Sequence, residues 1–223
     1  MRLLLAVALA AFGLAVTSGP APPAGAVPGV CPPICDAIPD AAWPVSSSLP
    51  LYSVYRWPGL AALAVTAPAP RFMFEELCGS PPMPADPRDY VVAARADIAN
   101  PPGQWRLRAQ VLHWRGNVVD SAPLMRSVFD TAQLRLRTCQ LTAPLVSPSI
   151  TTADAERTAA VISVAGRQVL RQYLLADPDS ASIVEFAMWS TLPVQVPWAA
   201  VPDVQVLDVL AAPLCEAYLG SCR

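Results

Sequence analysis

The only histidine of the chain, His113, is the residue whose type most readily suggests catalysis, because a neutral imidazole can accept a proton from a nucleophile. A serine hydrolase could use His113 as its general base with a distant Ser and Asp, since the members of a triad need not be close in sequence. The alternative is that a histidine beside Trp114 is packed or lies at the surface. The sequence has no G-x-S-x-G elbow, H-E-x-x-H helix, P-loop or dinucleotide-binding motif. These absences favour a noncatalytic protein, with His113 as the one catalytic candidate.

A concentration of arginine suggests a second kind of chemistry, anion binding. The chain has no lysine, and six arginines between Gln104 and Gln140 are accompanied by only two aspartates, a local charge of 6 − 2 = +4. Planar guanidinium groups suit the phosphate or carboxylate groups of an envelope component. The alternative is that these arginines lie on separate solvated faces. The predicted binding residues are Arg106, Arg108 and Arg115, together with Trp114.

Six cysteines form the third group, and an even number in an exported protein indicates three disulfides. Cys215 and Cys222 would lie about 10 Å apart on an unbroken helix, too far to bond to each other. We therefore expect Cys31 and Cys35 to pair with these two, while Cys78 joins Cys139. The CPPIC segment lacks the spacing and the further ligands of a zinc site, so we predict no metal and no cofactor.

Other candidate groups are less specific. Adjacent Glu75 and Glu76 would diverge on a helix, and Asp177 and Asp179 flank a proline in a predicted turn. Aromatic side chains could line a pocket for an apolar or sugar ligand, or they could fill the core. The tryptophans in question are Trp43, Trp57, Trp105, Trp114, Trp189 and Trp198.

Alternating apolar and polar residues predict a β-sheet that would position these groups. Tyr90–Ile98 and Trp105–Val111 both show the period of two that is typical of strands, and the turn between them predicts an antiparallel hairpin. A short strand is also expected at Leu51–Tyr55. Three further strands are predicted at Thr158–Val164, Gln168–Leu175 and Ser182–Trp189.

Helical spacing predicts three helices packed against this sheet. They cover Arg71–Leu77, a segment capped by Ser121 that ends near Cys139, and Asp203–Leu219. The middle helix has Pro123 in its first turn. Its expected core stripe consists of Leu124, Val128, Ala132 and Leu136, widened by Met125 and Phe129. The predicted fold class is α+β, a mainly antiparallel sheet with packed helices, braced by disulfides.

The N-terminus has the layout of a signal peptide. Arg2 precedes an uncharged apolar stretch, and small residues around Gly25 predict cleavage after Ala26. We expect residues 1–26 to be this signal peptide, 27–50 a Pro- and Ser-rich extended arm, and 51–223 a single domain. Hydrophobic residues make up 54% of the chain and charged residues 14%, which excludes general disorder. No later stretch predicts a membrane span, so we expect a secreted or envelope protein with no membrane span after cleavage.

Several of these features together resemble exported proteins of mycobacteria and related actinobacteria, many of which are uncharacterised. They are the signal peptide, the bias to Ala, Pro and Arg, and the cysteine-closed segment FDTAQLRLRTC with the strands after it. The region from about Ser121 to Trp189 is also similar to the extracellular sensor domain of mycobacterial receptor kinases. That resemblance implies a disulfide-braced α+β fold around a cleft. It covers under half of the mature chain, and the additional cysteines at both ends depart from the pattern.

The sequence therefore favours an exported noncatalytic binding or sensor-like module of the cell envelope. Its partner would be an envelope lipid, glycan or protein, while nucleic acid is disfavoured by the export signal and the net charge of −2. Two alternatives stay open. One is a secreted hydrolase that uses His113, and the other is a structural envelope interaction protein, which predicts a large exposed apolar patch.

Overall fold

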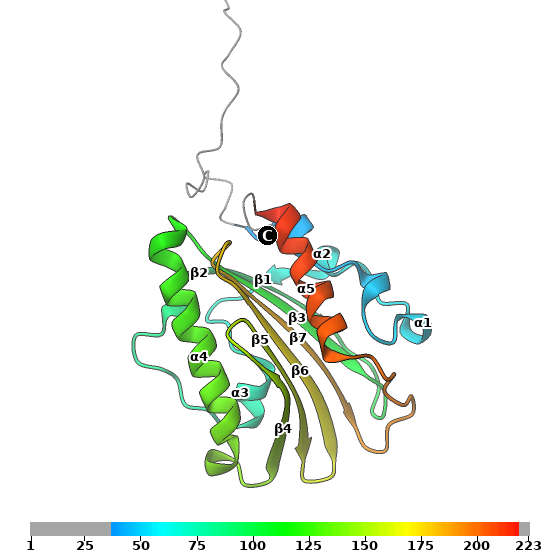
Figure 1. Cartoon of the computed structure of the whole chain (residues 1–223). Coiled ribbons are helices and arrows are strands. Elements are labelled where there is room, and N and C mark those ends of the chain that lie inside the picture. Colours follow the sequence, from blue (N-terminus) through cyan, green and yellow to red (C-terminus); the bar gives the residue numbers. More distant parts are fainter. Residues whose placement is uncertain (1–36, 219–223) are drawn as a thin grey trace, which may run out of the picture.

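A computed structural model describes residues 37–218, which form one seven-stranded antiparallel sheet with helices on both faces (Figure 1). The predicted α+β fold is confirmed. The predicted signal peptide, the first part of the arm, Cys31, Cys35 and Cys222 lie outside the described residues. The strand order is β1-β2-β3-β7-β6-β5-β4. The strands are β1 (Val65–Thr66), β2 (Val91–Ile98), β3 (Arg106–Trp114), β4 (Val146–Ala153), β5 (Arg157–Val164), β6 (Gln168–Asp177) and β7 (Ser182–Thr191).

The predicted hairpin is confirmed, because β2 pairs antiparallel with β3 along its whole length. The three later predicted strands are also present as β5, β6 and β7. Strand β4 was missed, since Pro148 and its Ser- and Thr-rich sequence hide the β pattern. Strand β4 forms an edge of the sheet. A proline is tolerated in an edge strand, because on the side without a neighbouring strand no N–H is needed for a hydrogen bond.

The predicted strand at Leu51–Tyr55 is wrong, because Tyr52–Tyr55 forms the short helix α1. Leu51 before it and Arg56 after it both adopt the left-handed conformation, with φ of 61° and 50°. Five residues of mixed apolar and polar type do not distinguish a strand from a single helical turn, so the tertiary contacts decide.

The long helix α4 (Val118–Thr142) has its N-cap four residues before the predicted cap Ser121. Its N-cap is Asn117, whose side-chain oxygen accepts a hydrogen bond from the N–H of Val119 at 3.0 Å. The core stripe is confirmed except at Leu124, which is 42% exposed. The remaining helices are η2 (Asp40–Ala42), η3 (Ser46–Ser48), α2 (Leu60–Leu63), α3 (Met73–Leu77), η4 (Pro87–Tyr90) and α5 (Asp203–Ala217).

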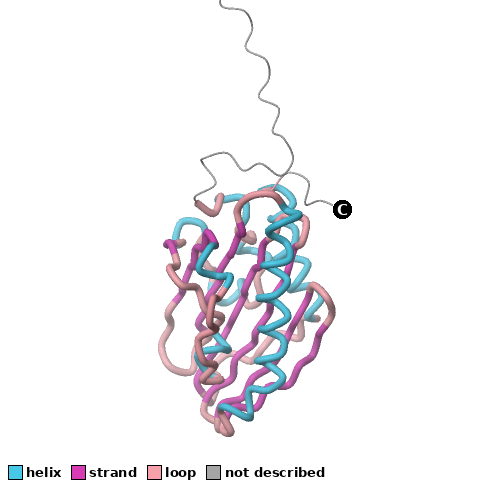
Figure 2. Tube along the Cα trace, turned by 90° about the vertical axis from the view of Figure 1, so that its left-hand side faces the viewer, coloured by secondary structure: helices cyan, strands magenta, loops and turns pink. Residues whose placement is uncertain are grey.

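The sheet separates two hydrophobic cores, one on each face. Helices α3 and α4 cover one face, while α5, α1 and α2 cover the other (Figure 1; Figure 2 gives the view from the α4 side). Alternation along β7 sends Ile183 and Ala187 to the α4 core and Val184 and Phe186 to the α5 core. Because both faces are covered, the central strands are buried on both sides.

The predicted Cys78–Cys139 disulfide is confirmed, with its Cα atoms 5.0 Å apart. It ties the end of α3 to α4. Cys215 is also disulfide-bonded, but the predicted pairing of the terminal cysteines lies outside the described residues. Within residues 37–218, no helix combines the length and the hydrophobicity that crossing a bilayer needs.

Candidate functional site

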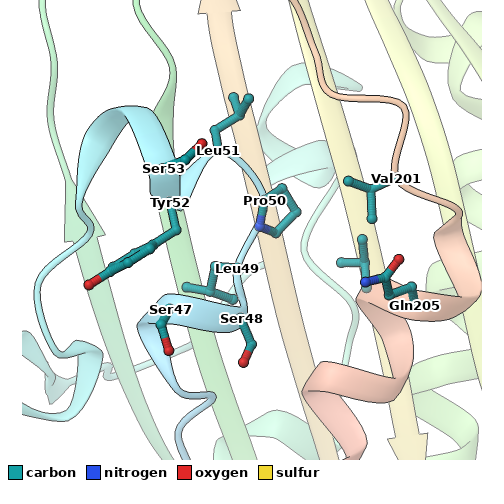
Figure 3. Close-up of a pocket in the computed structure, with 10 residues that line it drawn as sticks. Ser47, Ser48, Leu49, Pro50, Leu51, Tyr52, Ser53, Val201 and Gln205 are labelled. Carbon is teal, nitrogen blue, oxygen red and sulfur yellow. The ribbon is translucent and has the colours of Figure 1, made fainter.

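Two adjoining hollows open on the α5 face of the sheet. The first lies between residues 47–53 and the start of α5 (Figure 3), and the second lies within residues 40–61. Their volumes are about 300 and 410 Å³, at the lower end of the range for ligand sites. Both are lined by Ser47 and Tyr52, so we treat them as one groove, the serine groove. Its first hollow is lined by Ser47, Ser48, Leu49, Pro50, Leu51, Tyr52, Ser53, Val201, Gln205 and Val206. Its second is lined by Asp40, Trp43, Pro44, Val45, Ser46, Ser47, Tyr52, Trp57, Gly59, Leu60 and Ala61.

Polar contacts hold the wall of the groove in its irregular shape. The indole N–H of Trp57 donates to the carbonyl of Pro50 at 2.8 Å, and the Ser46 hydroxyl donates to the carbonyl of Pro58 at 2.6 Å. The Trp57 ring also stacks on Tyr55, with ring centroids 4.5 Å apart. These contacts fix a backbone in which Leu51 lies in the left-handed region, a conformation that costs a non-glycine residue about 1–2 kcal/mol. Strain of this kind is often kept where a chain serves a binding function.

Neutral polar groups supply most of the hydrogen-bonding capacity of the serine groove, whose lining is otherwise apolar. Serine hydroxyls and the Gln205 amide can both donate and accept hydrogen bonds, and Asp40 is the one charged side chain among its lining residues. Exposed apolar side chains stand close to these residues, since Val45 and Val54 are 66% and 55% exposed and Val204 is 54% exposed. The lining includes no histidine and no cysteine. This combination suits binding of a neutral, hydroxyl-bearing molecule better than catalysis.

His113 lies near the end of β3 on the α5 face, where it is 8% exposed. Its Nδ1 is 3.0 Å from the hydroxyl of Ser182, and its ring stacks on Tyr218 at 4.4 Å. Burial lowers the pKa of His113 to about 4, the backbone of Ser180 opposes the shift, and the charge of Arg115 adds to it. A neutral imidazole with so low a pKa is a weak general base. Ser182 is fully buried, so a substrate has no access to this pair in the described conformation.

The other predicted binding residues are spread along β3 instead of forming one patch. Arg106 and Arg115 lie at opposite ends of the strand, about 30 Å apart for nine residues. Arg108 lies between the carboxylates of Asp97 and Glu76, with both ion pairs at 2.8 Å. Trp114 is 1% exposed, and its indole N–H donates to the carbonyl of Pro87 at 3.1 Å. Anion binding by these residues stays a prediction, and the structure gives them no common surface.

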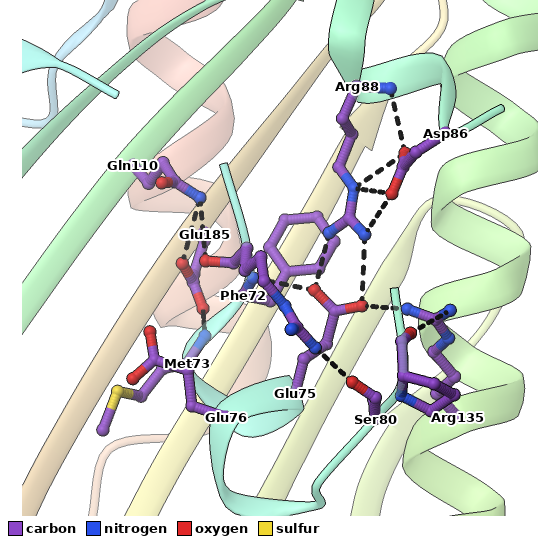
Figure 4. A network of polar contacts seen from close by, with 12 residues as sticks. Phe72, Met73, Glu75, Glu76, Ser80, Asp86, Arg88, Gln110, Arg135 and Glu185 are labelled. Carbon is purple, nitrogen blue, oxygen red and sulfur yellow. Dashed lines mark hydrogen bonds and ion pairs between the residues drawn. The ribbon is translucent and has the colours of Figure 1, made fainter. Parts of the chain in front are cut away.

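A buried ionic network on the α4 face links three elements (Figure 4). Arg88 of η4 pairs with Glu75 of α3 at 2.6 Å and with Asp86 at 2.7 Å, and Arg135 of α4 reaches Glu75 at 2.5 Å. Burial by itself would raise the pKa of Glu75. The hydrogen bonds and charge of Arg88 outweigh that effect and hold the pKa below its ordinary value. Within this network the charges are paired with one another, which indicates a structural role.

Beside this network, Glu185 is fully buried in the central strand β7 (Figure 4). Its carboxyl oxygens accept from the N–H of Met73 at 2.5 Å and from the amides of Gln172 and Gln110 at 3.0 and 3.4 Å. Burial raises the pKa of Glu185 to about 7, although these hydrogen bonds act in the opposite direction. The amide oxygens of Gln110 and Gln172 have no hydrogen-bond partner among the described residues, so a protonated Glu185 has acceptors nearby.

No protein-family model, curated protein or solved structure matches this chain. In the part of the chain that the structure describes, no group of three or more His, Cys, Asp or Glu side chains could hold a metal ion.

The serine groove was not predicted from sequence as a site. The sequence predicts the segment SSSLPLYSVYRWPG to be the end of a surface arm followed by a short strand. Its clustered serines and aromatics were a signal, but the contribution of Val201 and Gln205 could not be foreseen because they are about 150 residues away. Of the six tryptophans, Trp43 and Trp57 line the groove yet are only 5% and 3% exposed, so they support its floor more than they offer a stacking surface.

Proposed function

We propose that the protein is an exported, noncatalytic binding module of the cell envelope, and that it binds a neutral glycan in the serine groove. The observation that carries this proposal is the lining of the groove: hydroxyl and amide side chains beside Tyr52, with Asp40 as the one charged group. A glycan offers hydroxyls that match such groups and carries no charge that would need an arginine. The sensor-like character suggested by the resemblance fits the same role.

Export is part of the proposal. The Cys78–Cys139 disulfide supports it, since such bonds persist in oxidising compartments, and the N-terminal pattern supports it independently. Intact mass spectrometry of the nonreduced protein from its own host tests this point. The expected chain begins at Val27 and carries three disulfides, whereas a retained N-terminus or free thiols would contradict export as described.

Binding is tested with the purified mature protein on an array of neutral and acidic oligosaccharides, followed by titration calorimetry with the best neutral ligand. Tyr52→Ala and Gln205→Ala should each weaken binding about tenfold, a difference of about 1.4 kcal/mol, because both side chains face the groove. Tyr90→Ala and Gln140→Ala are matched controls, since Tyr90 is 75% exposed and both residues lie outside the lining. Binding of acidic glycans alone, or equal effects of all four variants, would reject the groove as the site.

A further inference from the structure

The outer face of α4 carries apolar side chains that no described element covers. The helix has 25 residues and is therefore about 37 Å long (Figure 1). Val119, Leu134 and Leu141 on this face are 76%, 58% and 82% exposed, and Leu145 just beyond the helix is 72% exposed. A helix that packs on a sheet by one face normally presents polar residues on the other. This outer face therefore has the composition of an interface.

Exposed side chains form a row along this face. Leu134 and Leu141 are seven residues apart, and the exposed Ser127 continues the row at the same interval. A repeat of seven keeps side chains along one seam of a helix and is typical of helices that pack lengthwise against each other. The inward face is already occupied, because Met125, Val128, Phe129, Ala132 and Leu136 are buried against the sheet.

In one orientation, the charged side chains of α4 would face opposite charges on a second copy of the same helix. Asp120 and Asp130 have no ion-pair partner among the described residues. Arg137 donates to the side chain of Gln133, and Arg126 donates to the carbonyl of Ala155. If two copies of α4 lie antiparallel about a two-fold axis near residue 128, Asp120 meets Arg137 of the second copy. In the same register Asp130 meets Arg126 of the second copy.

The apolar residues match in that same register. Leu134 meets Pro123 and Leu124 of the second copy, and Leu141 lies about three residues, or about 4.5 Å, beyond Val119 of the second copy. An arrangement about a two-fold axis forms every contact twice, which is the property of a self-complementary interface. A lipid surface would instead require Asp120 and Asp130 to enter an apolar phase, at a large cost in desolvation.

We infer that the outer face of α4 is the interface of an antiparallel homodimer formed by two copies of this chain. This inference does not depend on the proposed glycan binding, because the serine groove lies on the opposite face of the sheet. The dimer would leave the two grooves free and would present two binding sites in one assembly.

Sedimentation velocity of the purified mature protein over a wide concentration range tests the inference. The wild type should form a dimer that dissociates on dilution. Leu134→Asp should be monomeric throughout, because it places a carboxylate against the apolar Pro123 and Leu124 of the second copy. Val65→Asp is the matched control, since Val65 is 61% exposed but lies in the edge strand β1, and this variant should dimerise like the wild type.

A charge exchange tests the orientation. Asp120→Arg and Arg137→Asp should each raise the dissociation constant about tenfold, since each substitution changes two symmetry-related ion pairs. The double variant should return to nearly the wild-type value. A wild type that is monomeric at every concentration, or a dimer that Leu134→Asp leaves intact, would refute the interface. A double variant that is weaker than either single variant would refute the antiparallel register. Circular dichroism of each variant establishes that it is folded.

Discussion

The two faces of the sheet differ in how their covers are held. On the α4 face, a 25-residue helix, a disulfide and an ionic network around Arg88 fix the cover to the strands. On the α5 face, the segment 40–61 consists of single helical turns and loops with left-handed residues, and it leaves an open groove. The difference teaches that interactions which resist rearrangement are concentrated on the α4 face, while the α5 face keeps accessible polar groups.

The largest expected loss of stability comes from the ionic network. Arg88→Ala should lower the free energy of unfolding by about 5 kcal/mol, because removing one partner of a buried pair leaves Asp86 without its cation and leaves Glu75 with Arg135 alone. Urea denaturation measures this change. The control is Arg157→Ala, whose pair with Asp208 is 32% and 59% exposed and should contribute less than about 1 kcal/mol. Equal losses in the two variants would remove the distinction between the faces.

Removal of the Cys78–Cys139 disulfide should cost slightly less. Its sequence separation of 61 residues corresponds to about 4 kcal/mol in the chain-entropy treatment of the unfolded state. The double substitution Cys78→Ser with Cys139→Ser, followed by denaturation without reductant, measures this loss. Glycan binding at the serine groove should be unchanged under native conditions. Loss of binding in a folded double variant would show that the α4 face controls the groove.

Two buried groups on opposite faces should give the protein opposing pH dependences. Glu185 titrates at about 7 in the folded state against an ordinary 4.5, so the folded state keeps a proton that the unfolded state releases. Its contribution to stability is complete below pH 4.5 and is lost as the pH rises towards 7. His113 titrates at about 4 against 6.5, so the unfolded state takes up the extra proton. Its contribution is complete above pH 6.5 and is lost as the pH falls towards 4.

Between pH 4.5 and 6.5 these two contributions should nearly cancel, and single substitutions should uncover each one. In Glu185→Gln the free energy of unfolding should increase with pH by roughly 3 kcal/mol across this window, because only His113 remains. In His113→Asn it should decrease by a similar amount. Denaturation curves at several pH values measure both slopes. Parallel pH profiles for the two variants would show that one of the two buried groups is not titrating as described.

The smallest expected effects on stability belong to the groove. Tyr52→Ala and Gln205→Ala should change the free energy of unfolding by less than about 1 kcal/mol, since Tyr52 is only half-buried and Gln205 is exposed. Thermal denaturation beside the binding titration measures this. A large loss of stability in either variant would mean that the groove wall is part of the fold's support and not a surface kept for recognition.

The sequence by itself determined the α+β class, the central hairpin, three further strands and the Cys78–Cys139 bond. The strands and helices follow from local information, because the period of two in β2 and β3 and the helical spacing before Cys139 are visible in short windows. The bond follows from the cysteine count, once the terminal cysteines are assigned to one another. Only the tertiary structure decided the rest. It placed Gln205 and Tyr52 in the lining of one hollow, buried His113 against Ser182, separated Arg106 from Arg115, and left Leu124 and Leu134 exposed. Each outcome depends on which distant element covers which face of the sheet. The periodicity of a segment shows that one of its faces is buried, but it does not identify the element that packs against that face.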